Sequence, residues 1–139
     1  MSNQIFPPCF YRVSVMALIF KENKVFLIKE ADGRWSLPGG GLEVGESFEV
    51  GIKRELREEI GINTIKISPQ PMYTWTLIDV TSHGNKIPKL ILSFQVEVDS
   101  YDFKGNSEES TEFGFFSKDE IKNMNLHPNT KELSNVWTN

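Results

Sequence analysis

The stretch Gly40–Ile62 reads GGLEVGESFEVGIKRELREEIGI, and the rest of the chain is interpreted around it. It begins in a glycine-rich turn, Gly39–Gly41, and continues into a charged segment that we expect to be helical over Phe48–Ile60. Ser47 suits the position before this helix, because its hydroxyl can accept a hydrogen bond from an unpaired amide of the first turn. Gly61 suits the end, where a residue in the left-handed conformation commonly stops a helix. The stretch therefore predicts a glycine turn followed by one short helix.

Three glutamates lie at one edge of the apolar face of this helix. On a wheel of about 100° per residue, Glu55, Glu58 and Glu59 border an apolar stripe formed by Phe48, Ile52, Leu56 and Ile60. Like charges three and four residues apart repel each other by roughly a few tenths of a kcal/mol per pair, and by more when they are partly buried. Gly51 is a second anomaly, because a glycine inside a helix costs about 0.5–1 kcal/mol relative to alanine. Helix stability alone does not explain these features.

Two interpretations of the glutamates are open at this point. In the first, the basic side chains of the helix neutralise them in an ordinary solvated ion-pair helix, for example Arg54 with Glu58 at i, i+4. In the second, carboxylates at i, i+3 and i+4 converge on a divalent cation, Mg²⁺ or Mn²⁺, that also binds substrate phosphates. The backbone amides of Gly39 and Gly40 would then be able to approach an anion. The second interpretation describes an enzyme that acts on phosphates.

The same stretch resembles the signature of the Nudix hydrolases, G-x5-E-x7-R-E-U-x-E-E-x-G-U, in which U is aliphatic. Every specified position agrees: Gly40, Glu46, Arg54, Glu55, Leu56, Glu58, Glu59, Gly61 and Ile62. The resemblance implies one domain over residues 1–139 with an α/β (α+β) Nudix fold, an α/β/α sandwich around a mixed β-sheet. It also implies hydrolysis of a nucleoside diphosphate linked to another moiety, by attack of water on phosphorus in a pyrophosphate bond, with Mg²⁺ as cofactor and Mn²⁺ as its substitute.

The resemblance further implies roles for the residues of this box. Glu58 and Glu59 are the first choices as metal ligands, and Glu55 is either a third ligand or the base that orients water. The carbonyl of Gly40 is expected to face the metal.

Residues beside these ligands are expected to support them. Arg54 and Glu46 should pair, so that the arginine holds the glycine turn against the helix and orients the ligands. Some members of the family use a later glutamate as base or ligand, and Glu112 stands at the matching place before a short strand, with Glu109 as a weaker candidate.

Substrate recognition is expected across the sheet. Arg12, Tyr73, Trp75 and Phe94 are candidates for stacking on or clamping the nucleotide, although aromatic residues in strands more often belong to the core. Asn129 follows a proline and resembles the position where nucleotide-cleaning relatives read a base edge, but a helix N-cap explains it equally.

Composition limits the partners. The chain has 139 residues, a net charge of −4 and a pI near 5.2, without a sustained basic run, which disfavours nucleic acid or an anionic membrane as the main partner. A small-molecule nucleotide remains the expected substrate. Cys9 is the only cysteine, so an internal disulfide and a thiolate metal site are excluded. The apolar run 13–20 is too short to span a bilayer, and we expect a cytoplasmic protein.

Strand patterns flank the central stretch. We expect strands at 11–20, 25–29, 64–67, 72–80, 87–98 and 112–116, a polar mobile loop at 99–110, a helix from Ser117 with a capping box, and a last helix from Pro128 or Asn129 to about Trp137. The first two strands should form a hairpin through Glu22-Asn23. Strands interleaved with helices around one core favour a mixed sheet between helices.

Two other functions are weighed against hydrolysis. A prenyl diphosphate isomerase on the same scaffold needs a cysteine in the active region, whereas Cys9 is isolated near the N-terminus. A regulatory module that binds a nucleotide without turnover would be favoured by loss of glutamates from the box, and all of them are present. Nucleoside triphosphates or a nucleotide sugar are the default substrates, and a homodimer is left open.

Overall fold

The computed structural model describes residues 9–105 and 110–138. The strands are β1 (Arg12–Leu18), β2 (Phe20–Lys21), β3 (Lys24–Glu30), β4 (Trp35–Ser36), β5 (Gly39–Gly41), β6 (Thr64–Ile67), β7 (Tyr73–Val80), β8 (Lys86–Val98) and β9 (Ser110–Phe116). The helices are α1 (Phe48–Ile60), α2 (Lys118–Ile121) and α3 (Leu133–Val136). Among the described residues, no helix is both long and apolar enough to cross a membrane.

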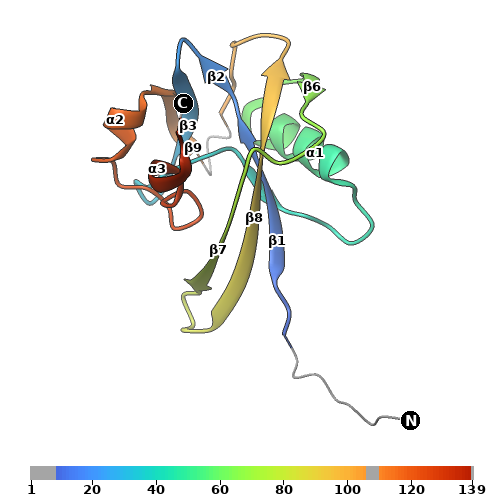
Figure 1. Cartoon of the computed structure of the whole chain (residues 1–139), viewed down its shortest axis with the longest axis vertical. Coiled ribbons are helices and arrows are strands. Elements are labelled where there is room, and N and C mark those ends of the chain that lie inside the picture. Colours follow the sequence, from blue (N-terminus) through green and yellow to red (C-terminus); the bar gives the residue numbers. More distant parts are fainter. Residues whose placement is uncertain (1–8, 106–109, 139) are drawn as a thin grey trace.

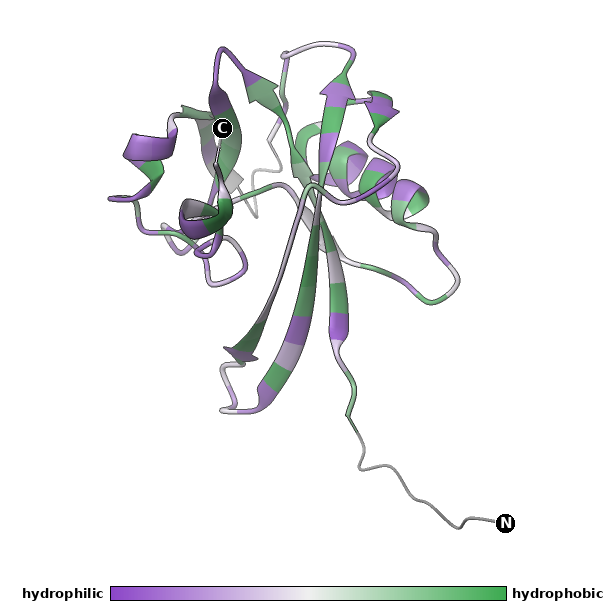
Figure 2. Cartoon of the chain, in the orientation of Figure 1, coloured by the Kyte–Doolittle hydropathy of each residue, from purple (hydrophilic) through white to green (hydrophobic). Residues whose placement is uncertain are grey.

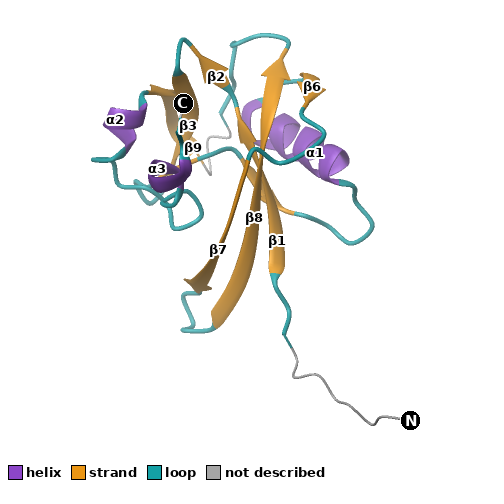
Figure 3. Cartoon of the chain, viewed as in Figure 1, coloured by secondary structure: helices purple, strands orange, loops and turns teal. Residues whose placement is uncertain are grey.

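The strands form two sheets (Figure 3). The larger sheet runs β5-β1-β8-β6, with β7 also paired to β8, and it is mixed because β1 and β8 are parallel whereas the other pairs are antiparallel. The smaller sheet is antiparallel, runs β2-β3-β4 and has β9 on the other side of β3. The predicted mixed sheet is confirmed.

Two apolar clusters cover opposite faces of the larger sheet. Side chains alternate across a strand, so Val15 and Ala17 of β1 pack with the buried stripe of α1, whereas Met16 and Leu18 pack with Ile121, Leu133 and Trp137 from α2, α3 and the C-terminal segment. In Figure 1, α1 accordingly lies on one side of the central strands and α2 and α3 lie on the other. Figure 2 shows hydrophobic residues along the central strands and mixed hydropathy along α1. The α/β/α arrangement expected from the sequence is confirmed.

The strand predicted at 11–20 is in fact divided between the two sheets. β1 pairs with β5 and β8, and the hairpin is made only by β2 and β3, where Phe20 faces Val25. Glu22 and Asn23 have φ values of 51° and 62°, as a tight hairpin turn with two left-handed residues requires. Ile19 is buried at the division, so the chain passes through the core as it changes sheet.

Two further predictions were wrong in detail. The glycine run is a strand, because Met16, Val15 and Ser14 of β1 pair with Gly39–Gly41. The last helix begins only at Leu133, since residues 127–132 form hydrogen-bonded turns and Asn129 donates its backbone N–H to its neighbour His127 instead of capping a helix. The predicted loop 99–110 is described only in part, and Glu109 lies outside the described residues.

Candidate active site

Helix α1 has the ends that the sequence predicted. The Ser47 hydroxyl accepts a hydrogen bond from the Val50 amide at 3.2 Å, and Gly61 is left-handed with φ 64°. The stripe is buried at Ile52, Leu56 and Ile60, whereas the fourth member, Phe48, is 44% exposed. The buried stripe fixes the rotation of α1, so that Glu55 and Glu59 are turned toward β5.

Two glycines of the box are required by close approach. A Cβ on Gly40 would lie 2.7 Å from Oε1 of Glu55, so the absence of a side chain lets this carboxylate sit over the strand backbone. A Cβ on Gly51 would lie 2.7 Å from Cδ1 of Leu42, which explains the glycine inside α1. The two glycines thus leave room for the side chains of Glu55 and Leu42 between α1 and the glycine strand.

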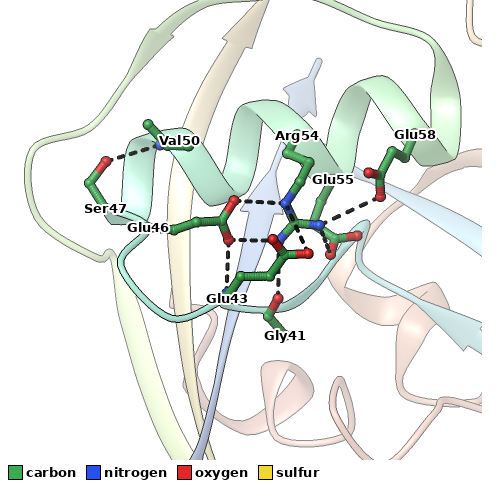
Figure 4. Close-up of polar contacts among 8 residues, drawn as sticks. All are labelled: Gly41, Glu43, Glu46, Ser47, Val50, Arg54, Glu55 and Glu58. Atoms are coloured by element: carbon green, nitrogen blue, oxygen red, sulfur yellow. Dashed lines mark hydrogen bonds and ion pairs between the residues drawn. The ribbon is translucent and has the colours of Figure 1, made fainter.

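Arg54 clamps the loop between β5 and α1 (Figure 4). Its Nε and Nη2 donate to the two carboxylate oxygens of Glu46 at 2.7 and 2.8 Å, and Nη2 also donates to the carbonyl of Gly41 at 3.2 Å. Its Nη1 donates to Oε1 of Glu55 at 2.8 Å, and the same nitrogen lies 3.5 Å from Glu58. One guanidinium thus fixes both the loop and the Glu55 carboxylate. The expected Arg54–Glu46 pair is present.

The contacts of Arg54 also shift the pKa values of the ion pair that it forms with Glu46. The hydrogen bonds from Arg54 are the main reason that the pKa of Glu46 falls to about 2, and a bond from the Glu43 amide adds to the effect. Pairing with Glu46 raises the pKa of Arg54. The pair is therefore fully ionised at neutral pH.

Glu55 and Glu59 form a second unit on the same helix edge. Glu59 Oε1 accepts a hydrogen bond from the Gly39 amide at 3.0 Å. Burial is the largest cause that raises the pKa of Glu59 to about 9, followed by its hydrogen bond with Glu55, and the charge of Glu30 adds a smaller contribution. In the absence of a metal ion, Glu59 is thus protonated at neutral pH and hydrogen-bonded to Glu55.

This pair suits a divalent cation. Two carboxylates that must hold a proton between them offer hard oxygen ligands, and a cation can replace that proton. Glu58 is 62% exposed and stands beside Arg54. In the described part of the chain, no three acidic, histidine or cysteine side chains converge as a ready metal cluster. Two of the three predicted carboxylate ligands, Glu55 and Glu59, therefore lie together, and Glu58 is turned outward.

The remaining expected substrate residues fall into two groups. The Arg12 guanidinium lies directly against Gly41, on the face of the sheet opposite Glu55. Tyr73, the first residue of β7, is partly buried, and its hydroxyl accepts a hydrogen bond from the Thr138 amide. Trp75 and Phe94 are only 7% and 1% exposed and belong to the core, so neither ring offers a face for stacking.

Glu112 lies in β9, which pairs with β3. It faces Lys29 across β3 and β9, and its carboxylate lies 3.9 Å from the Lys29 ammonium. Lys29 in turn lies over the ring of Trp35. The sequence pattern placed Glu112 correctly on a strand, but strand register decides which side chains it meets.

A turn near the C-terminus, residues 127–131, contains Asn129, the only one of its residues that the sequence singled out. We call it the C-terminal turn. Three hydrogen bonds tie it to distant strands: the His127 amide donates to the Trp35 carbonyl, Trp75 Nε1 donates to the Asn129 carbonyl, and the Leu37 amide donates to Thr130 Oγ1. No local motif signals such contacts, because each partner is far away in the chain.

A family model described as the NUDIX domain matches residues 10–136. The chain belongs to the Nudix family. The nucleoside triphosphatase NudI of Escherichia fergusonii is 41% identical over 76 residues, which cover 49% of this chain and 50% of the relative. The chain therefore spans about half the length of the curated relatives that it matches.

Solved Nudix structures share the fold. The MutT Nudix hydrolase of Burkholderia pseudomallei superposes with a TM-score of 0.77 at 23% identity, over 93% of this chain and 99% of that chain. The E. coli ORF135 protein gives a TM-score of 0.74 at 22% identity, over 91% of this chain and 88% of that chain. At these sequence identities the two structures show that the fold is shared, and they do not show a shared activity.

Proposed function

We propose that this Nudix domain is a pyrophosphohydrolase that cleaves a nucleoside triphosphate by attack of water on phosphorus, with Mg²⁺ as cofactor and Mn²⁺ as its substitute. The observation that carries the proposal is the Glu55–Glu59 pair, held between the Arg54 clamp and the Gly39 amide. The name of the matched NudI relatives supports a nucleoside triphosphate as the substrate class.

The box residues would have two roles, metal binding and positioning of the base. Glu55, Glu58, Glu59 and the Gly40 carbonyl would hold the cation, which when bound neutralises phosphate charge and lowers the pKa of water. Arg54 fixes the orientation of Glu55, so that this carboxylate can accept a proton from the attacking water.

Substrate phosphates would approach along β5. Arg12 carries a guanidinium that lies beside Gly41, the last residue of β5. The Gly39 amide donates to Glu59 and the Glu55 carboxylate lies over Gly40, so the phosphates would meet these carboxylates through the cation. In the C-terminal turn, Oδ1 of Asn129 is buried without a hydrogen-bond partner among the described residues, which supports the expected contact with a base edge.

The test is release of phosphate or pyrophosphate, with Mg²⁺, from a panel of nucleoside triphosphates, nucleotide sugars and dinucleotides. The Glu59→Gln variant is compared with Glu49→Gln, a control on the same helix whose carboxylate is exposed and paired with Lys53. We expect wild type and control to hydrolyse a triphosphate and Glu59→Gln to lose that activity. Tight nucleotide binding without turnover of any member would instead support the regulatory module.

A further inference from the structure

His127 occupies the start of the C-terminal turn, and its ring has one fixed tautomer. Nδ1 accepts a hydrogen bond from the Asn129 backbone amide at 3.0 Å, so this nitrogen carries no proton. Burial, followed by the charge of Arg34, lowers the pKa of His127, and the imidazole is neutral at pH 7. The ring proton therefore resides on Nε2.

The Nε2–H group faces away from the turn. Because Nδ1 points toward the backbone of the turn, Nε2 lies on the other edge of the ring, and its hydrogen does not bond to the turn. Within the described part of the chain, no protein atom accepts a hydrogen bond from it. The ring is half-buried, so this donor is directed but free to meet a ligand.

The charges around His127 are already balanced. On one side, Arg34 Nη2 lies 2.7 Å from Asp32 in the turn between β3 and β4. On the other, Lys89 of β8 lies 2.8 Å from Asp79 of β7. Both ion pairs act on the ring, with two positive and two negative charges in all. Such surroundings favour a neutral polar group over a phosphate, which would need an excess of positive charge.

The C-terminal turn also holds its polar groups rigidly. Thr130 is fully buried and receives the amide of Leu37, two residues before β5 begins. Two positions along from His127, Oδ1 of Asn129 is a buried acceptor without a partner among the described residues. An unpaired donor and an unpaired acceptor on one turn complement a heterocycle that presents an acceptor and a donor, as nucleobase edges do.

We propose that His127 is a specificity-determining residue, whose Nε2–H donates a hydrogen bond to a carbonyl oxygen or ring nitrogen of the nucleobase. This proposal rests on the proposed function, because it assigns the base end of the same nucleotide site. It extends that site from the Nudix box to a residue outside it.

Two matched substitutions separate recognition from support of the turn. In His127→Asn, the side-chain oxygen can still accept from the Asn129 amide, but the outward donor is lost. In His127→Gln, the amide nitrogen can replace the outward donor, but the inward acceptor is lost. Melting temperature reports the structural role, and KM and kcat across nucleoside triphosphates with different bases report recognition.

We expect His127→Asn to raise KM for the preferred nucleoside triphosphate by about 5- to 20-fold, the effect of one lost hydrogen bond. Its kcat, its melting temperature and its affinity for inorganic triphosphate, which has no base, should stay close to wild type. Compared with His127→Asn, the His127→Gln variant should have a lower melting temperature and a smaller change in KM. If His127→Asn leaves the KM for every base unchanged while wild type turns over, the inference is overturned and the proposed function stands.

A measurement on the wild type does not depend on the variants folding. The ¹⁵N shift of His127 Nε2 is followed by NMR as nucleoside monophosphate is added with Mg²⁺. A shift of this nitrogen without a shift of Nδ1 supports the inference, and nucleotide binding that leaves both unmoved overturns it. If wild type binds and hydrolyses no nucleotide at all, the proposed function itself fails.

Discussion

The Nudix box and the C-terminal turn, which we propose to contribute to one site, are built in opposite ways. In the box, the groups that meet are close in sequence: Arg54 contacts Glu46, Glu55 and Gly41, all within one loop and one helix. In the C-terminal turn, Thr130 meets Leu37 and Asn129 meets Trp75, across 93 and 54 residues. The catalytic groups can thus be encoded locally, whereas the base recognition that we propose depends on tertiary packing.

The largest expected effect is on catalysis in the box. Glu55→Gln keeps an oxygen for the Arg54 Nη1 hydrogen bond, so the clamp should survive. The variant loses the charge needed for a cation ligand or a base, and kcat should fall by about 10³-fold. Phosphate release with saturating Mg²⁺ checks this, with Glu49→Gln as the control that should retain activity. A fall of less than tenfold would remove Glu55 from the chemistry.

The next effect is on stability without metal. The pKa of Glu59 is about 9 in the folded protein and near 4.5 when unfolded, so the folded state binds the extra proton between these values. The free energy of unfolding should therefore be highest, as far as this group is concerned, below pH 4.5 and should fall as the pH rises toward 9. Glu59→Gln cannot ionise, and its amide can still donate to Glu55 and accept from Gly39.

We expect metal-free Glu59→Gln to be more stable than wild type by about 2 kcal/mol at pH 8, with the difference vanishing below pH 4.5. Urea unfolding in a chelator across this pH range measures it. Added Mg²⁺ should reverse the order, because binding to the folded wild type stabilises it. Parallel pH curves for the two proteins would show that Glu59 is not held protonated.

The sequence predicted the box closely because its physics is local. The Ser47 cap, the left-handed Gly61 and the Arg54–Glu46 pair all depend on neighbours within one helix and its loop. The mixed sheet and the covering helices also followed from strand and helix patterns. Pairing did not follow, since nothing local tells that Gly39–Gly41 adds to β1 as a strand.

Side-chain placement across the sheet was the weakest prediction. Phe94 and Trp75 fit a stacking role by type, but strand alternation directs both into the core, where burial is more favourable. Glu112 was expected near the metal, and the register of β9 places it beside Lys29. His127 gave no signal at all, because its fixed tautomer depends on a turn that forms only when distant strands hold it.

The smallest expected effect comes from weakening the hydrogen bond that holds the C-terminal turn to Leu37. Thr130→Val keeps the shape of a fully buried side chain but removes the acceptor of the Leu37 amide, leaving a buried donor unpaired. We expect a loss of about 1–2 kcal/mol in the free energy of unfolding, against almost none for Thr76→Val, whose side chain is exposed on β7. If the C-terminal turn is a recognition element, KM for nucleotides should also rise while turnover of bound substrate stays near wild type. A variant that loses stability but keeps its KM would mean that the turn supports the fold without reading the base, because the box alone would then bind the substrate.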